Sequence, residues 1–196
     1  RHPDFARALL ARITELCKTL MGHFLRECGD NIDMIKIGDD LGMQNSLLIS
    51  PKMYREILKP FHADYISFIK AHTKAKVFFH TDGDVYPLIP DFIEMGVDIL
   101  NPIQTSAGKM SDLDGLKKQF GKNIIFCGGI DTHRVLPFGT PEDVRKEVKR
   151  IIDVLGNSLG FVACGTITSD DKADLASRLC QLHDGLAHVM HSYMPH

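Results

Sequence analysis

The stretch Val77-Phe78-Phe79-His80-Thr81-Asp82-Gly83 decides how the fold of this chain is interpreted. It begins as a short apolar strand, and Gly83 breaks it after the polar residues. Residues two apart on a strand share a face, so His80 and Asp82 project together from its end, about 6–7 Å apart. An imidazole beside a carboxylate can bind a metal or exchange a proton. The alternative is a plain turn, because Asp-Gly is a common turn sequence that a neighbouring histidine can cap.

The rest of the chain repeats a pattern of strand followed by helix around this stretch. Hydrophobic periodicity and capping residues predict strands at 32–37, 76–80, 97–100, 123–127 and 160–164. The same signals predict helices at 3–28, 51–72 with a kink at Pro60, 85–95, 111–120, 141–155 and 172–191. The strands are short and apolar on both faces, which is typical of an α/β fold with a parallel sheet and helical crossovers.

Composition indicates one ordinary globular domain spanning residues 1–196, with 44% hydrophobic and 24% charged residues. The net charge of −2 and the absence of a basic stripe argue against nucleic acid, and no apolar run is long enough for a membrane span. Five cysteines, an odd number, favour free thiols in the cytoplasm over a disulfide framework. The first residue is arginine, in no signal-peptide context, so we expect a processed, excised or truncated chain.

Polar or glycine-rich groups follow every predicted strand. They are Asp39 and Asp40, His80 and Asp82, Asn101 and Gln104, Gly128 and Gly129 with Asp131, and Cys164. The carboxyl ends of strands carry the site in parallel α/β folds, so this distribution predicts a functional rim. The C-terminal histidines 183, 188, 191 and 196 lack an H-E-x-x-H pattern and are expected to complement a helix dipole.

Several rim residues have a structural alternative. Asp39 and Asp40 alternate faces, so at most one enters a given cavity, and both could instead belong to a capped turn. Asn101 could hold a loop by bonding backbone groups, and the Gly128-Gly129 pair could form a bend rather than a ligand contact. Cys164 could be a thiolate ligand or a small buried hydrophobe.

Five collinear segments carry a resemblance to a known family. They are Gly38-Asp39-Asp40-Leu41-Gly42, then residues 50–55, 89–104, 128–132 and 136–142. Over roughly residues 35–163 the chain resembles the uroporphyrinogen decarboxylase superfamily, which includes zinc- and corrinoid-dependent methyltransferases such as methylcobamide:coenzyme M methyltransferase. The resemblance implies a TIM (βα)₈ barrel with its site at the carboxyl rim. Because a complete barrel has eight strands, the five expected here would be its C-terminal part, with the N-terminal strands missing.

The resemblance also implies roles for individual residues. In the methyltransferase branch a His-x-Cys pair and a late Cys hold zinc. His80 matches that histidine, Asp82 stands where the first cysteine would be, and Cys164 lies near the place of the second. Zinc accepts carboxylate in place of thiolate, so the implied metal set is His80, Asp82 and Cys164. Asp39 and Asp40 are the implied catalytic groups, and the implied substrate-binding residues are Asn101, Gln104, Gly128, Gly129 and Asp131.

Three functions remain open at this stage. The first is metal-assisted methyl transfer from a methylcorrinoid, free or on a corrinoid protein, to a small-molecule thiol. The second is cofactor-free decarboxylation of the tetrapyrrole uroporphyrinogen. Gly165-Thr166 stands where that branch has a Gly-His pair, and its N-terminal arginine-rich segment has no counterpart here. The third is a non-catalytic remnant that binds or assembles. We expect this chain alone to be inactive.

The strand count also predicts an assembly. Five strands cannot close an eight-stranded barrel, so the strands at 32–37 and 160–164 would both be sheet edges. We therefore expect a homo-oligomer, formed by exchange of the helix at 3–28, or an association with the missing part of the barrel.

Overall fold

The fold is a single parallel sheet with helices packed along one side of it. The structure, a computed structural model, describes residues 2–156 and 160–165. The strands lie in the order β1-β2-β3-β4-β5, and every neighbouring pair is parallel. They are β1 (Met34–Gly38), β2 (Lys76–His80), β3 (Ile99–Ile103), β4 (Ile125–Ile130) and β5 (Phe161–Gly165).

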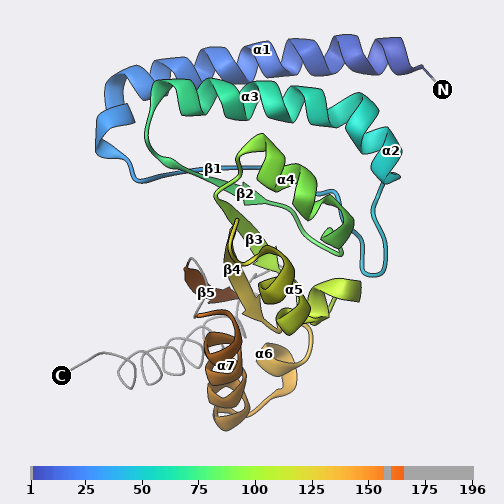
Figure 1. Cartoon of the computed structure of the whole chain (residues 1–196), viewed down its shortest axis with the longest axis vertical. Helices are drawn as coiled ribbons and strands as arrows, with labels where there is room; N and C mark the ends of the chain where they lie inside the picture. Colours follow the sequence, from blue (N-terminus) through green and yellow to red (C-terminus); the bar gives the residue numbers. More distant parts are fainter. Residues whose placement is uncertain (1, 157–159, 166–196) are drawn as a thin grey trace.

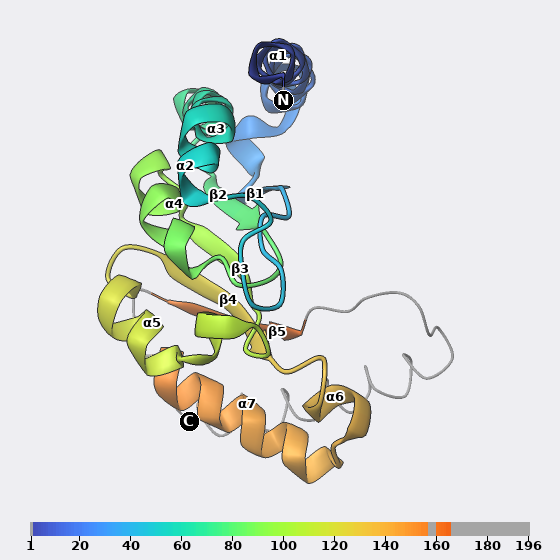
Figure 2. The ribbon, with the colours of Figure 1, turned by 90° about the vertical axis from the view of Figure 1, so that its right-hand side faces the viewer.

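The described helices alternate with these strands. They are α1 (Pro3–Cys28), α2 (Pro51–Met53), α3 (Lys59–His72), α4 (Ile89–Met95), α5 (Leu113–Phe120), α6 (Val135–Phe138) and α7 (Pro141–Leu155). Figure 2 shows α3, α4, α5 and α7 on the same side of the sheet. A sequential strand order without a reversal is the pattern of a barrel wall, whereas doubly wound sheets reverse direction at a switch point. The predicted α/β fold, part of a TIM barrel, is confirmed.

β3 and β4 each end three residues later than the sequence indicated. β3 runs through Asn101-Pro102, a cis peptide, to Ile103, and its pairing with β4 shifts between Leu100 and Ile103. β4 continues through Gly128 and Gly129 at φ of 116° and 95°. The expected ends at 100 and 127 were wrong because proline is tolerated at a strand irregularity and glycine adopts positive φ without a clash.

The helix signals were mostly accurate. The capping box of Thr140 and Asp143 starts α7 as predicted. The predicted kink at Pro60 is confirmed, because α2 and α3 are joined by a wide π-helical turn, Tyr54–Leu58, just before this proline. Ser111 was the wrong cap for α5, since Asp112 accepts the cap hydrogen bond from Gly115 N–H.

The remaining helices differ from expectation or lie outside the description. The short helix α6 was not expected. The helix expected from 85 begins instead as a 3₁₀ turn, Tyr86–Leu88, and becomes α-helical only at α4. The helix predicted at 172–191 and the histidines at 183, 188, 191 and 196 lie outside the described residues.

The core lies between the sheet and its helices. Phe79 and Phe92 pack with their ring centroids 5.0 Å apart, and Tyr54 and Phe126 are fully buried in the same cluster. The side chain of Phe78 lies on the opposite face of the sheet from Phe79. It packs in a separate small cluster with Ile99 and Cys127. Adjacent strand residues alternate faces, so these two clusters confirm that the strands are apolar on both faces.

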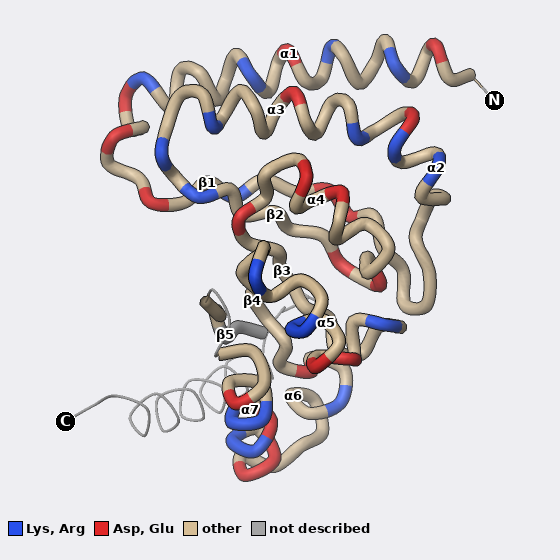
Figure 3. Tube along the Cα trace, viewed as in Figure 1, with Lys and Arg blue, Asp and Glu red and all other residues tan. Residues whose placement is uncertain are grey.

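Figure 3 shows charges of both signs interspersed along the long helices α1, α3 and α7. Over residues 2–156 and 160–165, no helix combines the length and apolarity needed to cross a bilayer.

Candidate functional site

Three side chains that could ligate a metal meet at the carboxyl ends of β1 and β2. Gly38, the last residue of β1, pairs with His80, the last residue of β2, so the residues that follow the two strands lie side by side. His80 Nε2 is 3.6 Å from Asp82 Oδ2 and 4.0 Å from Asp40 Oδ1. One donor atom from each of the three residues lies within 4.8 Å of the others. The expected projection of His80 and Asp82 together is therefore realised, with Asp40 as a third member.

A contact between two glycines holds the loops that carry Asp40 and Asp82. Gly42 N–H donates to Asp82 O at 3.1 Å, and Asp82 N–H donates to Asp40 Oδ1 at 3.1 Å. A Cβ at Gly83, whose φ is +86°, would lie 2.4 Å from the carbonyl carbon of Gly42, which is closer than atoms approach. The backbones can touch only because both positions lack a side chain.

Thr81 ties the same loops from within. Its side chain is fully buried, and its hydroxyl oxygen accepts a hydrogen bond from Leu41 N–H at 3.0 Å. Its own N–H donates to Asn101 O at 2.7 Å. Sequence reasoning assigned Thr81 no role, although it lies between the two residues that were chosen; only the tertiary contacts show it linking the ends of β1, β2 and β3.

Asn101 sets the protonation pattern of the His80 ring. Its amide NH₂ lies 3.5 Å from the carbonyl oxygen of Cys127, which can only accept, so its Oδ1 faces His80. That oxygen is 2.7 Å from His80 Nδ1 and accepts a hydrogen bond from Nδ1–H. A neutral His80 consequently carries its hydrogen on Nδ1 and a free lone pair on Nε2, the nitrogen that faces Asp40 and Asp82.

We expect Asn101→Ala to weaken divalent metal binding by roughly tenfold, because such supporting hydrogen bonds orient a metal-ligating imidazole. Nitrogen-detected NMR of the His80 ring should show Nδ1–H in the unaltered protein and a mixture of tautomers in the variant. The ring of His62, which faces Asp39 and Tyr54, is the internal reference. An unchanged His80 tautomer in the variant would contradict the assignment.

Asp39 points away from this cluster, as the alternation of faces predicted for the Asp39-Asp40 pair. Its carboxylate lies 3.5 Å from Nε2 of His62 on α3. His62 Nδ1 in turn lies 3.2 Å from the hydroxyl of Tyr54. Burial, together with the negative charges of Asp91 and Asp39, raises the pKa of Tyr54 far above its usual range, so this phenol stays protonated. Nothing in the sequence singled out His62 beyond its place in an amphipathic helix.

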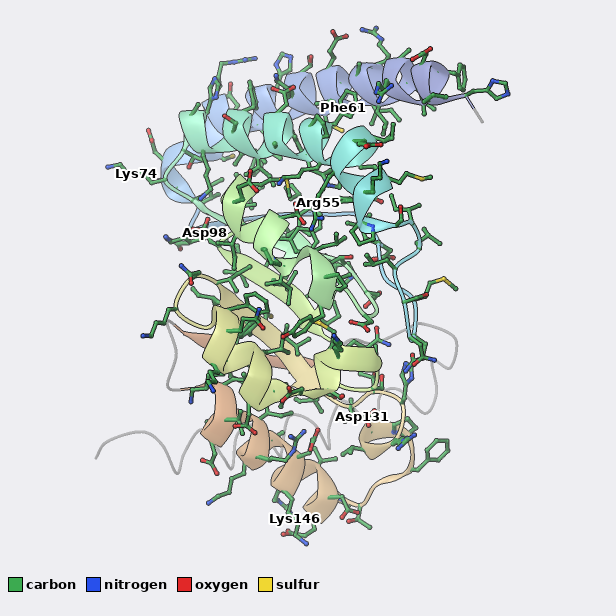
Figure 4. All side chains as sticks on the ribbon, turned by 45° about the vertical axis from the view of Figure 1, so that its right-hand side comes forward. Arg55, Phe61, Lys74, Asp98, Asp131 and Lys146 are labelled. Carbon is green, nitrogen blue, oxygen red and sulfur yellow. The ribbon has the colours of Figure 1, made fainter. Side chains whose placement is uncertain are left out.

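The expected substrate-binding residues mostly find partners inside the chain. Asn101 is 7% exposed, and its Oδ1 is hydrogen-bonded to His80. Gln104 Oε1 accepts from Gly83 N–H at 2.8 Å and so supports the loop of Asp82. Asp131 Oδ1 accepts from the backbone N–H groups of His133 and Arg134 at 2.7 and 3.0 Å, in the loop before α6 (Figure 4). Substrate contacts of these residues stay a prediction.

The remaining predicted residues lie further along the sheet. Gly128 and Gly129 are inside β4, where a Cβ would meet Ile103 N at 2.9 Å and a methyl carbon of Ile151 at 3.1 Å. Cys164 lies on β5 with its backbone paired to Gly129, and its side chain is outside the described part of the structure. Its predicted role as a third ligand therefore stays a prediction, and Asp40 is the third potential donor that lies beside His80 and Asp82.

Comparison with known proteins identifies the family. The sequence profile of the uroporphyrinogen decarboxylase (URO-D) family matches residues 1–168, most of the chain. The chain belongs to the uroporphyrinogen decarboxylase family. A solved structure of a methyltransferase from Methanosarcina mazei superposes on this URO-D-family chain with a TM-score of 0.59 and 18% sequence identity. The superposition covers 82% of this chain and 43% of the methyltransferase, and it confirms the shared fold.

A second similarity concerns a shorter stretch of the chain. It is 64% identical over 58 residues to a crossover junction endodeoxyribonuclease RuvC from Sinorhizobium medicae, and 63% identical over 57 residues to that of Rhizobium etli. The matches cover 30% and 29% of this URO-D-family chain, which spans about a third of the length of these nucleases, 35% and 34%. Only residues 169–196 lie beyond the URO-D match, fewer than the nuclease alignments need, so the two matched stretches overlap.

Proposed function

We propose that Asp40, His80 and Asp82 hold a divalent metal ion and that the chain serves metal-assisted methyl transfer from a methylcorrinoid to a small thiol. The convergence of these three donor groups at the carboxyl rim carries the proposal. Membership of the URO-D family and the fold shared with a methyltransferase support the class of chemistry. The corrinoid would arrive free or on a corrinoid protein.

The donor set fits a catalytic ion. Two carboxylate oxygens and one imidazole nitrogen are three protein ligands, the number that catalytic zinc sites use while leaving a position for substrate. The Asp40 side chain is 63% exposed and that of Asp82 35%, so a small molecule can reach the cluster from solvent. Without thiolate among these three donors, the set is harder than a cysteine-rich site and also suits Mn²⁺ or Fe²⁺.

The residues of the chain have distinct tasks in this proposal. A bound ion would lower the pKa of a thiol and so supply a thiolate nucleophile. His80 offers Nε2 to the ion, while its Nδ1 faces Oδ1 of Asn101 at 2.7 Å. The Gly42–Gly83 contact and the buried Thr81 keep the two carboxylate-bearing loops together before anything binds. Such preorganisation reduces the cost of ordering ligands when the ion arrives.

Metal titration tests the site directly. Isothermal titration with Zn²⁺, Mn²⁺ and Fe²⁺ should show one ion per chain, and His80→Ala should weaken binding at least about 100-fold. Asp40→Ala should weaken binding as well, whereas Asp39→Ala, the neighbouring carboxylate on the opposite face, is the matched control and should leave affinity unchanged. Equal metal affinity of the His80→Ala and unaltered proteins would contradict the proposed metal site.

Activity assays separate the functional alternatives. Methyl transfer predicts a spectral change of the methylcorrinoid on thiol addition, lost when a chelator removes the ion. The decarboxylase alternative predicts porphyrins with fewer carboxylates, formed from uroporphyrinogen whether or not a chelator is present. Absence of both reactions, in a chain that still folds, would favour the non-catalytic binding role.

We do not extend junction cleavage from the nucleases to this chain. The shared stretch is a third of those proteins, and DNA binding relies on neutralising phosphates with clustered Lys and Arg. The net charge here is −2, and the long helices α1, α3 and α7 each carry both signs (Figure 3).

A further inference from the structure

The loop between β1 and α2 forms a short hairpin, the strap (residues 41–48). Gly42 and Leu47 make the antiparallel bridge that closes it, and Asp84 N–H donates to Met43 O at 2.8 Å. In Figure 2 the strap descends from β1 past the end of β2 toward β3. It therefore lies over paired strands and not at the edge of the sheet.

A chain of side-chain amides ties the tip of the strap to the loop that carries Asp82. Gly83 N–H donates to Gln104 Oε1 at 2.8 Å, and Gln104 Nε2 donates to Gln44 Oε1 at 3.4 Å. Gln44 Nε2 in turn donates to the carbonyl oxygen of Ser106. The chain joins the loops that follow β1, β2 and β3, and it ends one residue from Asp82, a potential metal ligand.

The backbone groups at the two ends fix the orientation of both amides. A backbone N–H can only donate and a carbonyl oxygen can only accept. Gly83 N–H therefore requires the oxygen of Gln104 to face it, and the carbonyl of Ser106 requires the nitrogen of Gln44. The remaining groups, Nε2 of Gln104 and Oε1 of Gln44, then meet as donor and acceptor. Because each link sets the direction of the next, loss of one link weakens the others.

We propose that Gln104 and Gln44 are positioning residues, which hold Gly83, and through it the carboxylate of Asp82, in place for the metal ion. This inference rests on the proposed metal site. The contact between Gly42 and Gly83 holds the loop of Asp82 from the side of β1, and the amide chain holds it from the side of β3. Gln104 thus acts on the position of a ligand and need not touch the substrate.

Methionine replacements remove each amide and keep the length of the side chain. We expect Gln104→Met to weaken Mn²⁺ binding by roughly tenfold, the usual effect of losing a hydrogen bond that supports a ligand. Gln44→Met should weaken it by about threefold, because Gln44 reaches Gly83 only through Gln104. The double variant should bind no more weakly than Gln104→Met, since the chain is already broken. Asn45→Met is the matched control, because Asn45 is an exposed strap residue outside the chain.

The electron paramagnetic resonance signal of free Mn²⁺ measures these affinities, and hydrogen exchange at the Gly83 amide tests the same tie without metal. We expect that exchange to accelerate roughly tenfold in Gln104→Met, while the urea midpoint stays unchanged. A role in stability alone would instead lower the midpoint and accelerate exchange throughout the chain.

Two results would overturn the inference: unchanged Gly83 exchange in Gln104→Met, or affinity losses that simply add in the double variant. An unaltered chain that binds no ion would instead overturn the proposed function, and Gly83 exchange would still decide whether the amide chain holds this loop.

Discussion

Gly83→Ala is expected to lower the free energy of unfolding by about 3 kcal/mol, one of the two largest effects foreseen for single substitutions. Two costs add. The residue sits at φ +86°, where a side chain is strained, and its Cβ would overlap the backbone of Gly42. Relief requires the loops carrying Asp40 and Asp82 to separate, so metal affinity should fall with stability. Urea unfolding and metal titration of the same sample measure the two effects.

Gly96→Ala is the matched control for that substitution. Gly96 ends α4 at φ +88°, so an alanine there carries the same left-handed strain. Its Cβ would meet only the flexible side chain of Lys70, at 3.0 Å. We expect a loss of about 1 kcal/mol and unchanged metal binding. Equal destabilisation by the two variants would mean that the contact between Gly42 and Gly83 contributes nothing to the site.

Asp91→Ala is expected to destabilise the fold by about 2 kcal/mol, because it removes the charged hydrogen bonds that a nearly buried carboxylate accepts from Arg55 and Lys59. Asp91 is 4% exposed on α4 and accepts hydrogen bonds from Arg55 at 2.9–3.1 Å and from Lys59 at 2.8 Å. Arg55 extends from the π-helical turn before α3 toward α4 (Figure 4), so the pairing fastens the kinked helix to α4. Equilibrium unfolding of the variant measures the loss.

Glu94→Ala is the control for the Asp91 substitution. Glu94 also bonds Lys59, at 2.6 Å, but its side chain is 73% exposed. Exposed pairs contribute little, so this change should cost less than about 0.5 kcal/mol. A loss for Glu94→Ala as large as that for Asp91→Ala would show that burial of Asp91 is not what gives the pairing its strength.

The same carboxylate predicts a dependence of stability on pH. Burial alone would raise the pKa of Asp91, but hydrogen bonds and charges from Arg55 and Lys59 outweigh it and hold the pKa below its usual value. A pKa lowered in the folded state contributes stability above the unfolded value of about 3.9, and that stability is lost as pH falls through the lowered folded value. The difference in unfolding free energy between the unaltered protein and Asp91→Asn should therefore be at its maximum at pH 7 and decrease below about pH 4.

The sequence alone determined the elements and their class. Apolar runs separated by amphipathic helices indicated a parallel α/β sheet, and β2 was predicted at residues 76–80 as it is observed. Local chemistry decides such features, because capping, periodicity and turn propensity act over a few residues. The pairing of His80 with Asp82 and the opposite directions of Asp39 and Asp40 followed from strand alternation alone.

Only the tertiary structure decided which residues meet. Asp40 and Asp82 are 42 residues apart, and nothing local places the end of β1 beside the end of β2 at the register that joins them. The sequence was likewise compatible with two roles for Asn101, binding a ligand or fixing a loop. Its hydrogen bond to His80 depends on the pairing of β2 with β3. The strand ends at Pro102 and Gly128 were misjudged because neighbouring strands, rather than intrinsic propensity, hold those residues extended. Several conformations of these residues have similar local free energies, and long-range packing selects one of them. The packing of the strands therefore assembled the site.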